Sequence, residues 1–430
     1  MNYKEYKKYL FRFSYPIIIS AIFMTLANVA TNIIISYLGE SELIAKNIYS
    51  TYNSLYLAFN AGFALMFASY YSKYKDDKEK QGACLKISTV VIGVISIIIM
   101  ILFILFRDML FKIYSTDSNV LEISNIYSII RSLSFPIIGL QAFFTYVLSH
   151  NHRKRILVGN IVALVLEIVL VTIVTMYTDL GMPYIALIEV LSRLVKLIMF
   201  VIPFISVFKN RYINNYFATM NVKKVILNSR NILFISIMTF VNVIIGMALL
   251  KIYVYIDYSK FICITISNDV INITSNLFVA IYNIITTEIS THLYDKKEKK
   301  IIKEKIKYIR NYILNMFFWF ILLTIITGYI TLRLYNIDNE TYTYALNIII
   351  IRCILYLSIP LTILYTSLYK IFNKVKSLFL VDTVVDILLL IIILFIYRIF
   401  ETDLLQIILI YNILLIFKLY IIKKKLKFNY

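Results

Sequence analysis

The chain carries few charged residues for its length. Asp, Glu, Lys and Arg make up only 16% of its 430 residues, whereas a soluble protein carries about a quarter. Its three scattered cysteines, Cys84, Cys263 and Cys353, lack the spacing of a disulfide framework or a zinc site. The sequence has no GxxxxGK[ST] phosphate-binding loop. These absences exclude a soluble enzyme, a disulfide scaffold, a metal site built from cysteines and a chain that hydrolyses ATP on its own.

Long apolar runs dominate what is present. Hydrophobic residues make up 60% of the sequence, and one membrane crossing takes about 20 of them. We therefore predict an all-α membrane protein with twelve transmembrane helices. The predicted spans, numbered 1 to 12 in chain order, are 13–37, 43–70, 86–106, 120–148, 156–177, 184–208, 229–254, 261–291, 309–334, 342–369, 377–397 and 404–422.

The formal net charge of +20 comes from basic residues in short connections between the apolar runs. Nucleic-acid binding would need a basic patch on a folded domain, so we expect the bilayer, and not nucleic acid, as the partner. Most Lys and Arg residues fall in the connections on one side, which the positive-inside rule assigns to the cytoplasm. We predict a multi-pass protein of a bacterial inner membrane with both termini in the cytoplasm.

The two halves of the chain repeat each other. Met24–Val29 in span 1 matches Met238–Val243 in span 7, and Leu133–Pro136 in span 4 matches Leu357–Pro360 in span 10. Each repeat has six spans, so both enter from the same side, as in transporters with parallel repeats around a central site. We predict a six-helix lobe over 1–208, a cytosolic linker over 209–228 and a second lobe over 229–430. Pro136 and Pro360 predict kinks.

Several short motifs occur in a characteristic order. These are Tyr15-Pro16, Asn28, Tyr37-Leu38-Gly39, Asn60-Ala61-Gly62, Tyr114-Ser115-Thr116-Asp117, Phe135-Pro136, Leu180-Gly181-Met182-Pro183 and Ser192-Arg193. Taken together, they resemble the multidrug and toxic compound extrusion (MATE) family, within a wider flippase superfamily. The resemblance implies two six-helix bundles facing a central cavity, and export driven by a proton or sodium gradient.

The sequence departs from that family pattern at its usual coupling residues. Family members often carry an Asp in span 1 where this chain has Thr31, next to Asn32. Many also carry carboxylates in spans 7 and 10, where this chain offers Asn242 and Arg352. Coupling to H⁺ or Na⁺ would therefore depend on other acids.

Three carboxylates inside the spans are the candidates for ion coupling: Asp269, Asp386 and Glu167. A charge in the hydrocarbon is costly and usually faces a cavity or a partner. Asp269 shares one helical face with Asn272, Asn276 and Asn283. This stripe either lines the cavity or forms a hydrogen-bonded seam between helices.

Other polar and aromatic residues are candidates for the substrate cavity. Arg131 and Arg352 could bind an anionic substrate group, or they could neutralise a buried carboxylate such as Asp269 or Asp386. The full set of cavity candidates is Asn28, Thr31, Asn32, Arg131, Gln141, Asn242, Asn272, Asn276, Tyr282, Asn283, Arg352 and Tyr356.

The leading hypothesis is a secondary transporter, not an enzyme, that exports amphipathic organic compounds by proton- or sodium-coupled antiport. We expect a rocking motion of the two lobes, no cofactor and a functional monomer. The alternative is a lipid-linked saccharide flippase of the same superfamily. A major-facilitator transporter is disfavoured because its G-x-x-x-D-R-x-G-R-type loop after span 2 is missing.

Overall fold

The computed structural model describes residues 5, 8, 25, 26, 28–73, 77–151, 153–209, 230–275, 299–371 and 375–425. Within these residues the regular structure is helical, with no β-strand. Contacts divide the chain into two compact units. Unit 1 comprises Met1–Ile33 and Ala248–Tyr430, and unit 2 comprises Ile34–Met247.

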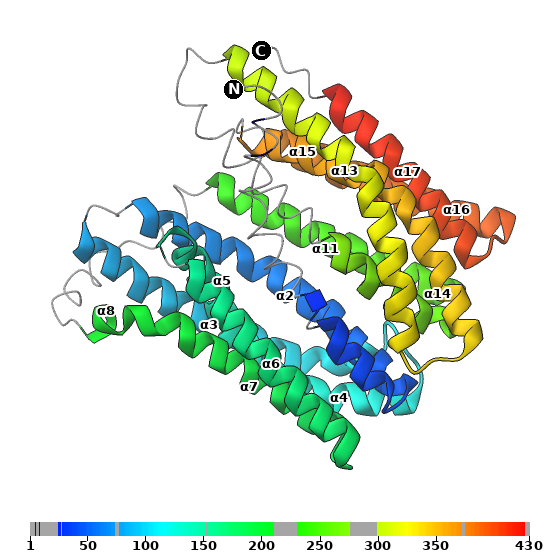
Figure 1. Cartoon of the computed structure of the whole chain (residues 1–430), viewed down its shortest axis with the longest axis horizontal. Helices are drawn as coiled ribbons and strands as arrows, with labels where there is room; N and C mark the ends of the chain where they lie inside the picture. The colour runs from blue at the N-terminus through cyan, green and yellow to red at the C-terminus, as the bar shows by residue number, and fades with distance from the viewer. Residues whose placement is uncertain are drawn as a thin grey trace. The chain divides into compact units, whose positions relative to one another are not determined.

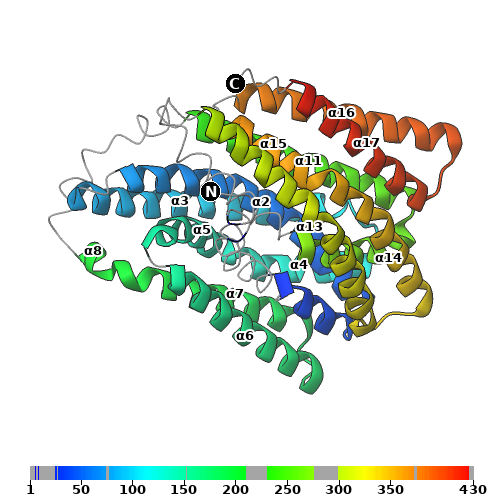
Figure 2. The same cartoon turned by 45° about the horizontal axis from the view of Figure 1, so that its top comes forward.

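Unit 2 is built on six long helices. Two pairs lie side by side: α6 runs along α7, and α2 packs against α5 (Figures 1 and 2). Aromatic side chains of α5 and α7 fill the core, with Phe143, Phe144 and Phe200 fully buried. The elements are α2 (Glu40–Lys73), α3 (Lys78–Phe111), α4 (Ser118–Ser132), α5 (Ser134–Asn151), α6 (Arg153–Tyr177), α7 (Gly181–Val201), η1 (Ile202–Phe204), α8 (Ile205–Lys209) and the first part of α11 (Arg230–Ile256).

Unit 1 contains the remaining helices. In both views α16 lies beside α17, and α13 and α14 also contact each other (Figures 1 and 2). The elements are the end of α11, η2 (Tyr258–Lys260), a helix over 261–275, α13 (Lys299–Leu334), α14 (Asn339–Arg352), η3 (Cys353–Leu357), α15 (Ile359–Ile371), α16 (Val375–Phe400) and α17 (Leu404–Lys425).

The helices confirm the prediction of an all-α membrane protein. Among the described residues, six helices are long and apolar enough to cross a membrane, or eight if each of two bent pairs is one span. Two further predicted spans are α2 and α7, which carry more polar and charged residues. The last two, spans 1 and 8, lie partly outside the described residues.

The predicted kinks at Pro136 and Pro360 are confirmed. The helix pair Ser118–Ser132 and Ser134–Leu148 is bent by 49°, and the pair Asn339–Tyr356 and Ile359–Tyr369 by 43°. Each proline lies in the first turn after its break, where a residue without an N–H group is tolerated. The bends occupy matching places in spans 4 and 10, as the internal repeat predicts.

Aspartates cap several helices outside the membrane. The Asp77 carboxylate accepts a hydrogen bond from the Lys80 N–H at the start of α3, and Asp338 accepts one from the Thr341 N–H at the start of α14. Hydrogen bonding to Lys80 lowers the pKa of Asp77, and bonding to Thr341 lowers the pKa of Asp338. These caps fix where the spans begin after polar connections.

The lobes predicted from the sequence, 1–208 and 229–430, do not have the same boundaries as the two compact units. The units assign residues up to Ile33 to the C-terminal part and residues up to Met247 to the N-terminal part. Nearly all of the predicted linker 209–228 lies outside the described residues. The lobe boundaries therefore stay a prediction.

The orientation in the membrane can be tested with single cysteines. Tyr177 at the end of α6 is 80% exposed and is predicted to lie outside the cell, while Lys424 near the end of α17 is exposed and predicted to lie inside. A membrane-impermeant maleimide should label Tyr177→Cys in intact cells and Lys424→Cys only after permeabilisation. The wild type is the control, because all three native cysteines are buried. The opposite labelling pattern would reverse the orientation.

Candidate functional site

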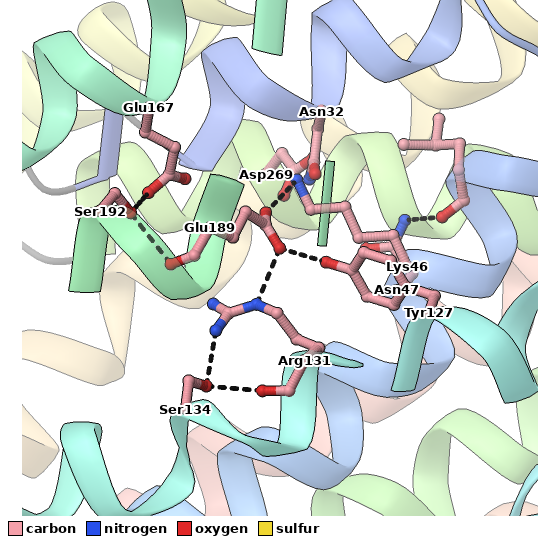
Figure 3. A network of polar contacts seen from close by, with 11 residues as sticks. Asn32, Lys46, Asn47, Tyr127, Arg131, Ser134, Glu167, Glu189, Ser192 and Asp269 are labelled. Atoms are coloured by element: carbon pink, nitrogen blue, oxygen red, sulfur yellow. Dashed lines mark hydrogen bonds and ion pairs between the residues drawn. The ribbon is translucent and has the colours of Figure 1, made fainter. Parts of the chain in front are cut away.

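A buried carboxylate in unit 2 is held by two cations. In α7, Glu189 Oε2 lies 2.7 Å from Arg131 Nε, and Oε1 lies 3.3 Å from Lys46 Nζ (Figure 3). The Tyr127 hydroxyl donates a further hydrogen bond to Oε2. All three charged side chains are nearly inaccessible. The ion pairs join α2, α4 and α7, so they connect three helices through the interior of unit 2.

The Arg131 side chain is oriented by further contacts. Its Nη1 donates to the Ser134 hydroxyl at 2.6 Å, and that hydroxyl donates to the Arg131 carbonyl at 2.7 Å (Figure 3). The guanidinium also lies 5.9 Å from the centre of the Tyr49 ring, a cation–π contact. The predicted cavity residue Arg131 is thus part of a buried ion-pair network, and its carboxylate partner is Glu189, not Asp269 or Asp386.

Two other predicted residues of unit 2 contact α7. The Glu167 carboxylate is buried and accepts a hydrogen bond of 2.7 Å from the Ser192 hydroxyl (Figure 3). The Gln141 side chain is also buried, and its amide donates to the backbone carbonyl of Arg193. The Gln141 amide therefore serves the contact between α5 and α7.

In unit 1, Asp269 is hydrogen-bonded by two neutral groups. Its Oδ2 accepts from Asn32 Nδ2 at 2.6 Å and from the Tyr335 hydroxyl at 2.7 Å. Asn32 and Tyr335 are buried, whereas Asp269 is half-buried. These contacts bring together span 1, the helix over 261–275 and the end of α13. Two residues predicted for separate roles, Asn32 and Asp269, thus meet in one site.

The carboxylates of α16 share one lysine. Lys418 Nζ in α17 lies 2.6 Å from Asp386 Oδ1 and 2.7 Å from Asp382 Oδ1. Asp382 and Asp386 are 4% and 7% exposed, so both are buried. The two aspartates do share a helix face, as their i,i+4 spacing predicts, and Lys418 compensates one of their two charges.

The remaining polar candidates of unit 1 bind other side chains. Arg352 Nη1 donates to the Asn268 side-chain oxygen. The Tyr356 hydroxyl is buried and hydrogen-bonds with Thr274 and with Thr324, the latter at 3.1 Å. Tyr356 therefore joins three segments of unit 1.

Seven predicted cavity residues are left. In the described residues, Asn28 and Asn272 are exposed, Asn242 is half-buried and Thr31 is fully buried. The other candidates, Asn276, Tyr282 and Asn283, lie outside the described residues. Their roles stay predictions.

Three residues of these networks were not predicted from the sequence: Lys46, Lys418 and Tyr335. The two lysines lie inside apolar spans, and a charge there is itself a signal of a buried partner or a functional site. Tyr335 gave no such signal among the 36 tyrosines of the chain. Within the described residues, no cluster of His, Cys, Asp and Glu could hold a metal ion.

Known protein families and solved structures resemble this chain in sequence and in fold. The MatE family model matches residues 16–173. An inward-facing multidrug resistance MATE transporter of the MOP superfamily shares 14% identity, with a TM-score of 0.77 over 94% of each chain. An outward-facing one shares 15%, with a TM-score of 0.73 over 97% of this chain and 95% of that one.

The chain has the fold of MATE transporters, and its N-terminal part matches the MatE family model. A third similar structure is a MOP superfamily transporter from Pyrococcus furiosus, which is described as having a binding pocket of reverse polarity. It shares 16% identity with this chain, with a TM-score of 0.72 over 97% of this chain and 95% of that one. No curated protein matches the chain. The resemblance to MATE transporters predicted from the sequence is confirmed.

We expect Glu189→Gln to destabilise this protein strongly. The change leaves the buried Lys46 and Arg131 without their shared counter-charge, and loss of one partner of a buried ion pair costs about 3–5 kcal/mol. The thermal unfolding midpoint in detergent is the measurement. Glu122→Gln, at an exposed acid of α4, is the control. Equal midpoints for the two variants would show that the Glu189 network contributes nothing to stability.

Proposed function

We propose that this chain exports amphipathic organic compounds by antiport against an inward proton or sodium gradient. The observation that carries the proposal is the environment of Asp269. Its half-buried carboxylate lies in predicted span 8 and accepts hydrogen bonds from Asn32 and Tyr335, which connect it to span 1 and to the end of α13. We propose Asp269 as the coupling residue, in a monomer located in a bacterial inner membrane with both termini in the cytoplasm.

Glu189 is less suited to exchanging an ion. If its carboxylate bound a proton, the buried Lys46 and Arg131 would lose their shared counter-charge, and an uncompensated buried charge is strongly unfavourable. Asp386 is not constrained in this way, because Lys418 would keep Asp382 as its counter-charge. Asp386 is therefore the second candidate for ion coupling in this proposal.

Alternating access is the mechanism that we propose for this cycle. Similar MATE transporters adopt an inward-facing and an outward-facing conformation, which supports a rocking motion in this chain. The bends at Pro136 and Pro360 mark the places in spans 4 and 10 where such a motion can be absorbed.

A lipid-linked saccharide flippase remains the second candidate. It is favoured by one observation, the presence of Lys46, Arg131, Arg193 and Lys196 in the interior of unit 2, since basic side chains recognise the pyrophosphate of such a lipid. The reverse polarity described for the Pyrococcus furiosus transporter also supports a substrate other than an organic cation.

Neutralising Asp269 should uncouple transport. Asn keeps the shape and hydrogen-bonding capacity of the side chain but cannot exchange a proton. In proteoliposomes with an imposed proton or sodium gradient, we expect Asp269→Asn to lose uphill transport of rhodamine 6G, with dye binding to the purified protein changed less than about threefold. Asp338→Asn, an exposed helix cap of the same unit, should keep full transport.

Two results would contradict this proposal. Uphill transport by Asp269→Asn at the wild-type rate would remove Asp269 as the coupling residue. Gradient-independent transport by the wild type, together with movement of a lipid-linked saccharide across the bilayer, would favour the flippase.

A further inference from the structure

Among the described residues, the interior of unit 2 holds more basic than acidic side chains. We use the name charge cluster for six charged residues of this interior that are buried or half-buried: Lys46, Arg131, Glu167, Glu189, Arg193 and Lys196. Four of these carry a positive charge and two a negative one. A net positive charge in the interior of a membrane protein is costly and usually marks a functional site.

The two carboxylates of the charge cluster do not balance its cations. Glu189 is bound by Lys46 and Arg131, so two cations already share its single negative charge. Glu167 is bound by Ser192 and acts electrostatically on Lys196. Even if Glu167 compensates one further cation, one positive charge is left without a counter-charge inside the charge cluster.

Lys196 is the most isolated of the four cations. The residue is only 7% exposed, and within the described part of the chain its ammonium makes no hydrogen bond or ion pair. The Phe200 ring lies 5.6 Å from Nζ, and this contact with an aromatic face adds no counter-charge. An ammonium desolvated to this degree normally has an anionic or hydrogen-bonding partner.

Arg193 and Lys196 lie on the face of α7 that points into unit 2, which we call the interior stripe. The residues three, four and seven positions from Arg193 on this stripe are buried, among them Ala186, Glu189 and Phe200. Arg193 itself is half-buried. Its Nε makes no hydrogen bond within the described residues. Lys196 follows Arg193 by three residues, so two like charges share one helix face, an arrangement that is unfavourable by itself.

We propose that Arg193 and Lys196 form an anion-binding subsite for the carboxylate, sulfonate or phosphate group of a transported amphipathic molecule. The guanidinium supplies a planar pair of donors and the ammonium a point charge, a combination suited to oxyanions. The opposite face of α7, with Leu187, Leu191 and Ile198, is exposed, so the two cations lie on the side away from the apolar surface. The inference rests on the proposed function only in taking the anion to be the transported compound.

Binding of two related dyes tests the subsite. Fluorescein is anionic and rhodamine 6G cationic, and both contain a xanthene core, so their affinities separate charge from shape. The measurement is fluorescence polarisation with purified protein in phosphatidylcholine nanodiscs and no gradient. We expect Lys196→Met and Arg193→Gln each to weaken fluorescein binding about tenfold, the loss of one charge-assisted contact, and to leave rhodamine 6G binding unchanged.

Three controls separate binding from structure. Lys154→Met removes an exposed lysine of α6 and should change neither affinity. Lys196→Arg keeps the charge and should retain fluorescein affinity to within about threefold. The thermal midpoint of Lys196→Met should not fall, because this ammonium has no hydrogen bond or ion pair to lose within the described residues.

The proposal is overturned if the wild type shows no saturable fluorescein binding, or if Lys196→Met leaves that binding unchanged. An equal loss for both dyes with a lower thermal midpoint would assign Lys196 to packing. Competition by phosphatidylglycerol in the nanodisc, abolished by Lys196→Met, would assign the subsite to a lipid headgroup instead. The binding assay uses no gradient, so it does not depend on coupled transport. If the protein binds fluorescein through Lys196 but never transports substrate uphill, the proposed function is wrong and the anion-binding subsite still holds.

Discussion

The cost of placing charge in an apolar interior governs the structure of this protein. In unit 2 the Glu189 carboxylate meets this constraint by binding Lys46 and Arg131 together, with Tyr127 as a further donor. Loss of one partner would leave a buried charge uncompensated, which is strongly unfavourable. The ion pairs therefore favour the packing of α2, α4 and α7 that keeps all three charges in contact.

The same constraint separates the acids of the chain into two kinds. Glu189 is bound by two cations and is suited to holding helices together. Asp382 and Asp386 instead share a single lysine, and Asp269 accepts hydrogen bonds from an amide and a phenol. Protonation of Glu189 would leave two buried cations without their counter-charge, whereas protonation of Asp386 would leave Lys418 paired with Asp382.

The sequence predicted the elements well because hydropathy decides them locally. The runs 156–177 and 404–422 correspond to α6 (Arg153–Tyr177) and α17 (Leu404–Lys425), and the kinks at Pro136 and Pro360 are confirmed. The partners of the buried charges were not predictable in this way. Glu189 precedes Arg193 at the favourable spacing for an ion pair within α7, yet it binds Arg131 of α4 and Lys46 of α2. Such pairings depend on packing between helices, which one sequence does not reveal.

The pairing of Glu189 with Lys46 and Arg131 has a consequence further along α7. Had Glu189 paired within its own helix, Arg193 would be neutralised and the interior stripe would carry little net charge. Because Glu189 is bound by two cations from other helices, it does not form an ion pair with Arg193 on its own helix. The ion-pair partners of Glu189 on α2 and α4 thus leave Arg193 and Lys196 to the proposed anion-binding subsite.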